Sequence, residues 1–420
     1  MSRLNVLALH QMGEPKYWRE VVRSLEFMIH DCRSDLNCLV HDCAYPFPDY
    51  LQDLDFHLVV LGPTFLCNRY REENLAKTLQ NFRFLVQTKA CKVALPQDDY
   101  DCSAILDDWL HDWSVDRIYT VCPDQWEILY PTCTQKTQIM LGYTGYVSEE
   151  WIETWKLPKP HGKREIDVSY RATKLPANFG SLGQLKYEIA GSFAKAIKNN
   201  PRIKTDISVR FEDMIPGKRW HEFMNNSRCC LVTPSGSSLL DPRNEIRKCV
   251  EGYVTHNPQA SFREIEEHCF PGEDKRHIFS AISPRNIEAA LAETVQLATP
   301  GDYSGLMKPD QDCVLLREDC SNIKEVLKLI QDPQKCKTVA RRSKEKILSE
   351  PRLRRANIVQ EIVDFGARIA SERRIPEANQ NKVDKAFRKY QKDKETNFQA
   401  FSSKKGIRYF FKKIFKRRKA

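Results

Sequence analysis

The stretch "SPRNIEAALAETVQLATPGDYSGLM", Ser283 to Met307, contains the pattern that decides the fold. Ser283 followed by Pro284 is typical of the start of a helix, because serine caps free backbone amides and proline suits the first helical position. The run "TVQLATP" is short and mostly apolar, as a strand buried on both faces is. A turn rich in Pro, Gly, Asp and Ser follows. A helix, a buried strand and a polar loop form one repeat of a parallel α/β sheet, whose ligands bind beyond the carboxyl ends of the strands.

The same repeat recurs along both halves of the 420-residue chain. Short apolar runs alternate with helical patterns, and this alternation predicts two doubly wound parallel sheets. We therefore predict an α/β fold of two Rossmann-like domains that face a cleft, and the cleft is the expected ligand site. The predicted strands are 4–10, 56–62, 91–96, 116–122 and 138–143 in the first half, and 166–172, 206–211, 228–234, 294–300 and 312–318 in the second.

Changes in composition place the domain boundaries. The stretch "WIETWKLPKPHGKRE" combines two prolines, a glycine and several charges, which is typical of a linker. A charged segment with a helical pattern interrupts the second half as an insertion. The predicted organisation is a first Rossmann-like domain at 1–150, a linker at 151–165, a second Rossmann-like domain at 166–372 with an insertion at 240–280, and a polar and basic amphipathic extension at 373–420.

The overall composition fits a globular protein of the cytoplasm. Hydrophobic residues make up 41% of the chain and charged residues 29%, which is ordinary for a soluble protein. No apolar run approaches the roughly 20 residues that a membrane span needs. Fifteen cysteines, none of them in a CxxC pair, favour free thiols in a reducing compartment over disulfides or zinc. We expect no metal site.

The positive charge is concentrated in the C-terminal tail. Nine Lys and Arg residues and no acidic residue lie between Lys404 and Ala420, so the net charge of +10 leaves +1 for the rest of the chain. This distribution argues against a nucleic-acid-binding core. Apolar residues of the tail share one helical face, which favours a helix lying in an anionic membrane interface over a solvated tail or a nucleic-acid-binding arm. They are Ile407, Phe410, Phe411, Ile414 and Phe415.

The opening stretch also contains candidate binding residues. The helix start at Ser283 offers free N–H groups and a positive dipole end, which suit a phosphate, and Arg285 can add a bidentate contact. Glu288, one turn further along, can accept hydrogen bonds from the two hydroxyls of a ribose. An isolated glutamate on a helix is more often a solvated surface residue, and that alternative stays open.

Two loops and two cations offer further binding positions in the second half. The loop "TPSGSSLLD" presents hydroxyls and a glycine that suit a phosphate, although it does not have P-loop spacing. The glycines of "TPGDYSG" permit close approach of the backbone to a ligand. Taken singly, each loop is equally a simple turn. Arg171 and Lys186 can reach an anion in the cleft, or each can form a surface salt bridge.

Together these residues resemble the donor-binding domain of group-1 glycosyltransferases with the GT-B fold, closest to spore-coat-type and surface-polysaccharide relatives. The resemblance covers Ile166 to Ser371 and rests on "VSYRA", "LGQLKYEIA", "PSGSS" and "RNIEAALAETVQLATPGDYSG". It implies that Arg171 and Lys186 hold the donor diphosphate and that Glu288 binds the ribose. The full set of donor-binding positions is Arg171, Lys186, Ser235, Gly236, Ser237, Arg285, Asn286, Glu288, Gly301, Asp302, Tyr303 and Ser304.

Two positions depart from the pattern of that family. The family usually has a second glutamate eight positions before the ribose-binding one, where this chain has Ser280. The glycine at the end of the family's helix is Glu293 here. These differences concern the sugar-contacting part of the site more than its nucleotide-binding part.

The first half supplies the catalytic and acceptor side by analogy. His10 follows the first predicted strand, and Asp98 and Asp99 follow the third. A general base for an inverting transfer would lie at such positions, whereas a retaining transfer needs no strong base. The alternative for this acidic run is helix capping, with Asp101 just before "SAILDDWLHDW".

The resemblance implies a metal-independent, hexosyltransferase-like glycosyltransferase. It would move a sugar from a nucleoside diphosphate donor to a glycan or lipid-linked acceptor, in surface polysaccharide biosynthesis. The tail adds a cytoplasmic location at the inner face of an anionic membrane. We expect no cofactor besides the nucleotide-sugar substrate and no specific nucleic acid. Two alternatives stay open: a nucleotide-sugar epimerase on the same fold, and a non-catalytic relative that binds membrane or nucleic acid.

Overall fold

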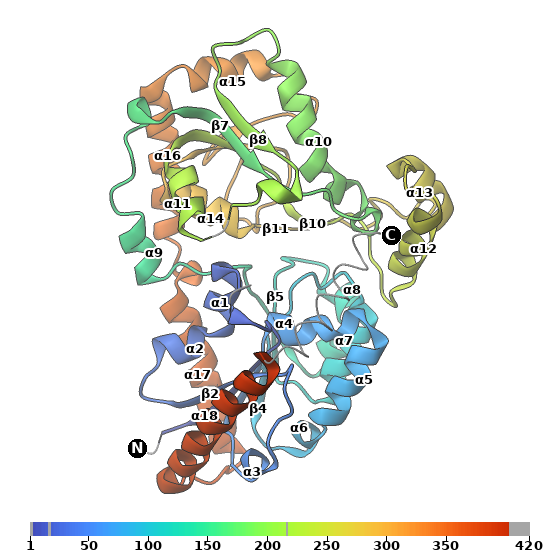
Figure 1. Ribbon diagram of the computed structural model, residues 1–420, viewed down its shortest axis with the longest axis vertical. Coiled ribbons are helices and arrows are strands. Elements are labelled where there is room, and N and C mark those ends of the chain that lie inside the picture. Colours follow the sequence, from blue (N-terminus) through green and yellow to red (C-terminus); the bar gives the residue numbers. More distant parts are fainter. Residues whose placement is uncertain (1–2, 16–17, 216, 403–420) are drawn as a thin grey trace.

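The chain forms two layered α/β units. The computed structural model describes residues 3–15, 18–215 and 217–402. In Figure 1 one sheet occupies the lower half of the molecule and the other the upper half, and helices cover both. All strands within each of these two sheets run parallel. The predicted fold class of two Rossmann-like domains is thus confirmed.

The first sheet has six strands in the order β2-β1-β3-β4-β5-β6. Its strands are buried on both faces, since Val6 and Ala8 pack into one hydrophobic cluster while Leu7 and Leu9 pack into another. This two-sided burial explains why most of its strands read as continuous apolar runs. The bounds are β1 (Asn5–His10), β2 (Asn37–Asp42), β3 (Leu58–Leu61), β4 (Cys91–Ala94), β5 (Arg117–Thr120) and β6 (Gln138–Leu141).

The strand β2 was not predicted. Its sequence "NCLVHD" begins and ends with polar residues, so it does not stand out as an apolar run. The structure nevertheless buries both Asn37 and Asp42. The helices between the strands of this half are α1 (Glu20–Glu26), α2 (Met28–Cys32), α3 (Asp49–Gln52), α4 (Pro63–Leu66), α5 (Glu72–Asn81), α6 (Phe84–Gln87), α7 (Ser103–Asp112) and α8 (Trp126–Leu129).

The second sheet has five strands in the order β13-β12-β9-β7-β8. All five coincide with predicted strands, to within a few residues at each end. The bounds are β7 (Ile166–Arg171), β8 (Thr205–Ser208), β9 (Ser227–Val232), β12 (Val295–Ala298) and β13 (Val314–Leu315). The helices that accompany this sheet are α9 (Glu149–Thr154), α10 (Gly180–Ala196), α11 (Lys218–Asn225), α14 (Pro284–Leu291), α15 (Ile323–Ile330) and α16 (Pro333–Leu348).

A small antiparallel ribbon brackets the insertion in the second half. It consists of β10 (Ser235–Ser237) and β11 (Phe279–Ala281), with α12 (Glu245–His256) and α13 (Phe262–Cys269) between them. The two helices pack on each other around Val250, Ile265 and Phe270. The insertion is helical, as its charge pattern indicated, and Figure 1 shows it at the side of the molecule, next to the first half.

The C-terminal helices return to the first sheet. The helix α17 (Arg355–Glu372) packs on β3 and β4, and Gly366 lies so close to Leu58 that a Cβ there would be only 3.1 Å from the leucine side chain. The structure therefore corrects the predicted end of the second domain at 372, because this helix belongs with the first sheet. An amphipathic pattern predicts that a helix is packed, but not which of two sheets it packs on.

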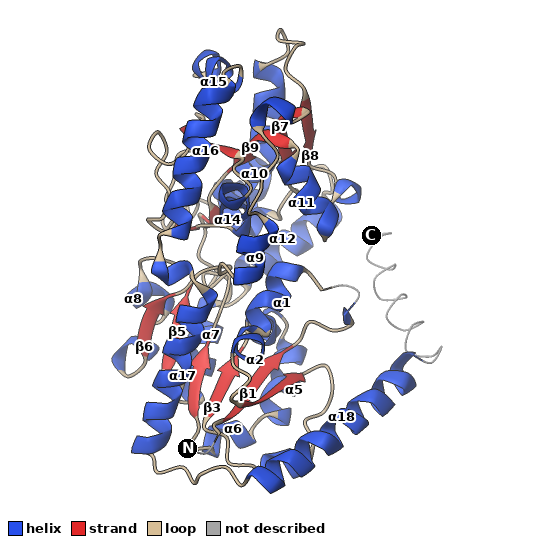
Figure 2. Ribbon diagram, turned by 90° about the vertical axis from the view of Figure 1, so that its left-hand side faces the viewer, coloured by secondary structure: helices blue, strands red, loops and turns tan. Residues whose placement is uncertain are grey.

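The extension beyond α17 is also packed in its described part. The helix α18 (Gln380–Ser402) runs alongside the first domain, as Figure 2 shows. Val383 and Tyr390 are buried in the core of that domain, and the Tyr390 hydroxyl lies 2.9 Å from Nδ1 of His41. The sequence predicts a polar extension here, and its sparse apolar residues, at helical spacing, are those that the structure buries against the first domain. The five tail residues assigned to a membrane lie outside the described residues.

The two halves meet through the carboxyl edges of their sheets. Two chain crossings lie side by side, where the amide of Val147 donates to Leu353 O at 2.7 Å and the amide of Arg355 donates to Val147 O at 2.9 Å. At the opposite side, Tyr100 of the first half stacks on Phe279 of the ribbon at a ring distance of 5.8 Å. Loops that follow the strands of both sheets are thereby brought face to face.

Candidate functional site

Glu288 lies on α14, close to the boundary between the two halves. The helix starts next to the first half: Pro284 is within 3.8 Å of the position that a Cβ on Gly145 would occupy, and Thr144 donates a hydrogen bond to Ile282 O at 2.9 Å. Glu288 is only 7% exposed, and burial raises the pKa of its carboxyl to about 7. The indole N–H of Trp220 donates to its Oε2 at 2.8 Å. The alternative of a solvated surface residue is therefore excluded.

Arg285 lies beside Glu288 without a carboxylate bonded to it. Its guanidinium sits 5.2 Å from the ring centre of Tyr170 and 5.7 Å from that of Trp220. One Nη donates to the carbonyl oxygen of Arg171, whereas the buried Nε has no hydrogen-bond partner among the described residues. A buried guanidinium N–H without an acceptor is costly, so this position favours an anion or another acceptor that arrives from outside the chain.

Lys186 faces the first half across the boundary. Its Nζ lies 3.4 Å from Oγ of Ser235, at the start of the ribbon. Burial lowers the pKa of Lys186, and the carboxylate of Asp98 in the first half opposes that shift. The charge of Asp98 thus acts on Lys186 although the two residues come from different halves.

Asp98 is exposed, and hydrogen bonds fix both its side chain and its loop. Its φ of 53° is in the left-handed region, and its Oδ1 accepts a hydrogen bond from the Tyr100 hydroxyl at 2.6 Å. The buried Arg69 fixes this loop, because it donates to the carbonyl oxygens of Gln97, Asp98 and Asp101 at 2.7 to 3.0 Å. The sequence did not single out Arg69, since one arginine in the short 3-10 turn Cys67–Tyr70 gives no signal of its own.

Arg171 does not join this group. Its guanidinium forms an ion pair with Asp206 at 2.7 Å and donates to the carbonyl oxygen of Asp213 at 3.0 Å. It also stacks over the ring of Phe223 at 4.5 Å. In this conformation Arg171 follows the salt-bridge alternative, and its guanidinium is turned toward β8 and α11.

Most remaining donor-binding predictions fall on residues that hold the loops together. Asn286 forms a reciprocal capping box with Ser283, and Ser237 bonds the backbone of Leu239. Tyr303 donates to Thr299 O at 2.9 Å, and Asp302 accepts from the amide of Gly305 at 2.9 Å. Of the two loops, only Ser235 has a side chain next to Lys186.

The two predicted glycines and Ser304 also have structural roles in these loops. A Cβ on Gly236 would come within 1.8 Å of Phe279 O, and one on Gly301 within 2.3 Å of Pro234. Both also have positive φ, so the loops require glycine whether or not a ligand binds. Ser304 accepts a hydrogen bond from the amide of Ile282 at 3.0 Å, which ties this loop to the start of α14.

The two departures from the family pattern have structural partners. Ser280 pairs with Gly236 in the antiparallel ribbon. Glu293, with a φ of 51°, lies just after the end of α14 and forms an ion pair with Lys344 at 3.1 Å. Neither side chain bonds Glu288, Arg285 or Lys186.

His10 and Asp99, by contrast, are enclosed within the first half. Burial lowers the pKa of His10 to about 3, with smaller effects from Lys394 and His41, so its imidazole is neutral near pH 7. Asp99 is fully buried; its Oδ2 accepts hydrogen bonds from the hydroxyls of Tyr130, at 2.6 Å, and Thr120. Asp101 does not cap α7, as it forms an ion pair with Arg247 of the insertion.

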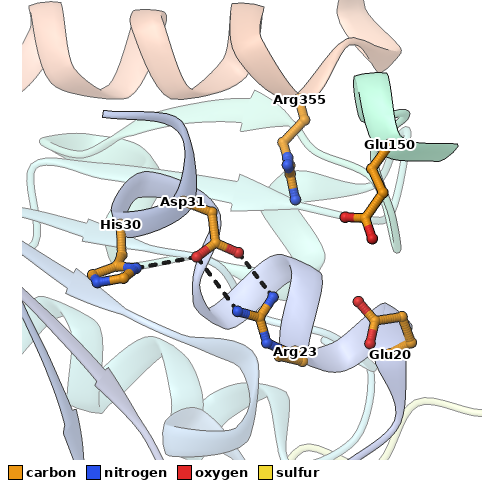
Figure 3. A pocket seen from close by; sticks show the side chains of 6 residues that line it. All are labelled: Glu20, Arg23, His30, Asp31, Glu150 and Arg355. Carbon is orange, nitrogen blue, oxygen red and sulfur yellow. Dashed lines mark hydrogen bonds and ion pairs between the residues drawn. The ribbon is translucent and has the colours of Figure 1, made fainter. Parts of the chain in front are cut away.

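A separate polar cavity of about 670 Å³ lies between α1, α2, α9 and α17 (Figure 3). Within it, Arg23 pairs with Asp31 at 2.8 Å, and Asp31 also accepts from His30 at 3.1 Å. None of the predicted site residues lines this cavity. The lining residues are Glu20, Arg23, His30, Asp31, Glu150 and Arg355.

The described residues contain neither a metal-binding group nor a membrane-spanning helix. Across residues 3–15, 18–215 and 217–402, no group of three or more His, Cys, Asp or Glu side chains could hold a metal ion. No helix in the same part of the chain has both the length and the apolar character that crossing a membrane requires.

Comparisons with known proteins place these features beside solved structures. No family model and no curated protein matches the sequence. An α-glucosyltransferase in complex with UDP-glucose and abasic-site DNA is similar at 10% identity over 87% of this chain and 99% of that one, with a TM-score of 0.49. Anabaena HepE in complex with UDP-glucose matches at 12% identity over 86% and 99%, with a TM-score of 0.47.

A third similar structure is that of TarM, at 10% identity, with 74% of this chain and 54% of that chain covered and a TM-score of 0.44. At these identities and scores the similarity by itself assigns no activity to this chain. The order of the strands in the two sheets establishes the fold, and the contacts of Glu288, Arg285 and Lys186 define the candidate site.

Proposed function

We propose that this chain is a glycosyltransferase that uses a nucleoside diphosphate sugar as donor. The observation that carries the proposal is the cluster of Glu288, Arg285 and Lys186 at the carboxyl edge of the second sheet, opposite Asp98 of the first. Ligands of parallel α/β sheets bind at this edge. A carboxylate that accepts hydroxyl groups beside two cations that attract a diphosphate suits a nucleoside diphosphate.

Each residue of the cluster has a role in the proposed transfer. Lys186 and Arg285 stabilise the negative charge that builds up on the leaving diphosphate. Glu288 binds the ribose hydroxyls. Asp98 is the best placed of the three predicted bases, because it is exposed toward Lys186 whereas His10 and Asp99 are buried. In an inverting transfer it would accept the proton of the acceptor hydroxyl.

The donor site can be tested by binding and by turnover. UDP, GDP and ADP are titrated into the full-length protein by calorimetry, and release of nucleoside diphosphate is followed with the matching sugar donors and lipid-linked acceptors. Glu288→Ala is expected to weaken binding at least tenfold, since a hydrogen bond to a charged group typically contributes about 1.5–3 kcal/mol. Glu325→Ala, in the exposed first turn of α15, is the control. Failure of all three nucleotides to bind would refute the proposal.

We further propose that the acceptor is a glycan or lipid-linked molecule of surface polysaccharide biosynthesis and that the protein works at the inner face of the membrane. The support is the sequence of the tail, with its nine cations and one apolar face. Deletion of 404–420 is expected to abolish sedimentation with phosphatidylglycerol vesicles while leaving nucleotide binding intact. Tail-dependent binding to DNA or RNA, but not to vesicles, would contradict this location.

The same experiments address the epimerase alternative. An epimerase would convert one nucleotide sugar into its isomer without an acceptor, whereas a transferase releases nucleoside diphosphate only when an acceptor or water takes the sugar. Chromatography of the nucleotide products distinguishes the two outcomes.

A further inference from the structure

We propose that Trp220 is an internal competitor for the nucleotide, because its indole N–H occupies the carboxylate of Glu288 that a ribose hydroxyl would use. The proposal rests on the proposed function, since it assumes that Glu288 belongs to a nucleotide site. It adds a residue of α11 to that site. In this conformation the bond between Trp220 and Glu288 blocks the ribose-binding part of the site.

The hydrogen bond between Trp220 and Glu288 is the first observation. Nε1 of the indole lies 2.8 Å from Oε2, and the carboxyl group is nearly inaccessible to solvent. A carboxylate oxygen accepts more than one hydrogen bond, but Glu288 is only 7% exposed, so a second donor has little access to Oε2 while the indole is bonded to it. A ribose hydroxyl that binds Oε2 from the cleft must therefore displace the indole.

The cation beside Glu288 is the second observation. Arg285 lies within about 6 Å of the rings of both Tyr170 and Trp220, a distance at which cation–π attraction holds a guanidinium against an aromatic face. Its buried Nε has no acceptor among the described residues. A diphosphate would supply that acceptor, and the ring contacts keep the guanidinium from leaving the site while none is bound.

A second aromatic residue of α11 acts on another predicted donor group. Phe223 lies three residues after Trp220 and so projects from the same face of the helix. The guanidinium of Arg171 stacks over its ring at 4.5 Å and is otherwise bound to Asp206 and Asp213. The helix α11 thus contacts Glu288, Arg285 and Arg171 together. If Trp220 served only to position Glu288, the contacts of this helix with the two arginines would not be needed.

The test compares two tryptophan variants of the full-length protein. Trp220→Phe keeps an aromatic ring and removes the N–H. Trp126→Phe is the matched control, since this half-buried indole donates one hydrogen bond at 2.8 Å to Cys122 O, within the first half. Affinities for UDP, GDP and ADP are measured by calorimetry, and tryptophan emission is recorded with and without nucleotide.

Trp220→Phe is expected to bind its preferred nucleotide about tenfold more tightly than the wild type, the factor that corresponds to a lost competing hydrogen bond of ordinary strength. Trp126→Phe should bind as the wild type does. The change of tryptophan emission on binding should be present in the wild type and lost in Trp220→Phe. Thermal unfolding of both variants shows whether each is folded.

Equal or weaker binding by folded Trp220→Phe would overturn the competitor proposal, because Trp220 would then position Glu288 for the ligand. The proposed donor site would survive that result as long as the wild type binds nucleotide. Binding by the variant alone would support both proposals. Absence of binding by every form would refute the donor site and the competitor together.

Discussion

The carboxyl edges of the two sheets face each other but differ in how their charged groups are bonded. At the first edge, Oδ2 of Asp99 accepts hydrogen bonds from the hydroxyls of Thr120 and Tyr130, although its Oδ1 has no partner among the described residues. Glu26 accepts the amide and hydroxyl of Thr64 at 2.7 and 2.6 Å. At the second edge, Arg285 keeps a buried N–H without an acceptor in the described chain. A buried polar group without an internal partner requires an explanation, which for Arg285 is an acceptor that the proposed ligand supplies.

The largest expected effect separates the adjacent residues Asp98 and Asp99. Asp99→Ala leaves the buried hydroxyls of Thr120 and Tyr130 without their acceptor, and we expect a loss of about 3 kcal/mol in the free energy of unfolding. Asp98→Asn should cost under about 0.5 kcal/mol, because asparagine tolerates the left-handed backbone. Urea denaturation measures both. Equal losses would show that the hydrogen bonds of Thr120 and Tyr130 to Asp99 contribute no more to stability than the exposed Asp98 does.

The next prediction concerns Glu26, whose pKa burial raises to about 8. The carboxyl of the unfolded chain has its ordinary pKa of 4.5, so between pH 4.5 and 8 the folded state retains a proton that the unfolded state has released. Stability therefore falls as pH rises through this range. Glu26→Gln should remove this fall and gain on the order of 2 kcal/mol at pH 8 relative to pH 5.

Denaturation curves at both pH values provide the measurement for Glu26. Gly62 serves as a check on packing, because a Cβ at this position would collide with the Glu26 carboxyl. Gly62→Ala should be destabilising at every pH. A slope with pH that is unchanged in Glu26→Gln would mean that this carboxyl is already charged in the folded protein.

At the second edge, the carboxyl of Glu288 has a pKa of about 7, which affects binding more than folding. The charged form accepts hydroxyl hydrogen bonds better than the neutral form. Nucleotide affinity should therefore rise between pH 6 and pH 8, by less than about tenfold. Glu288→Gln is the control, because the pH dependence of its nucleotide affinity should come only from titration of the nucleotide itself. Identical pH dependence in the wild type and in Glu288→Gln would show that ionisation of Glu288 does not affect binding.

The smallest effect is expected where the insertion meets the first half through exposed ion pairs. Lys248 pairs with Glu72 at 2.5 Å, with both side chains more than half exposed, and Arg71 pairs with Glu251 at 3.1 Å. Lys248→Ala should leave stability almost unchanged, with a still smaller effect at high salt. A clear loss in thermal or chemical unfolding that disappears at high salt would show that this contact helps to hold the insertion against the first half.

The sequence was sufficient for most strands of the two sheets. Ten of the strands follow from apolar runs, because burial on both faces leaves little room for polar residues. Glu288, Arg285 and Lys186 were assigned to one donor site through the resemblance to group-1 glycosyltransferases, and that assignment stays a prediction. Periodicity reports only that a residue is packed, so it assigned α17 to the wrong sheet and missed β2 with its polar ends.

Side-chain partners decided the rest, and no local pattern encodes them. Arg171 ends a strand where the resemblance expects a diphosphate ligand, but its partners Asp206 and Asp213 lie about 40 residues away. Trp220 and Arg69 were not singled out, because each acts through a contact that only the folded chain brings about. Asp98 and Asp99 are neighbours in sequence, and only the structure distinguishes the exposed carboxylate from the buried one.

The return of α17 and α18 to the first sheet determines the order in which the protein can fold during synthesis. The first domain obtains part of its core from Ile362, Val383 and Tyr390, which leave the ribosome after the whole second domain. Domains usually complete themselves in the order in which they are translated. Here the second domain is complete first, and the N-terminal domain keeps apolar surface exposed until the last helices arrive. A chain stopped at residue 350 should therefore aggregate or require a chaperone, although every strand of both sheets is already present.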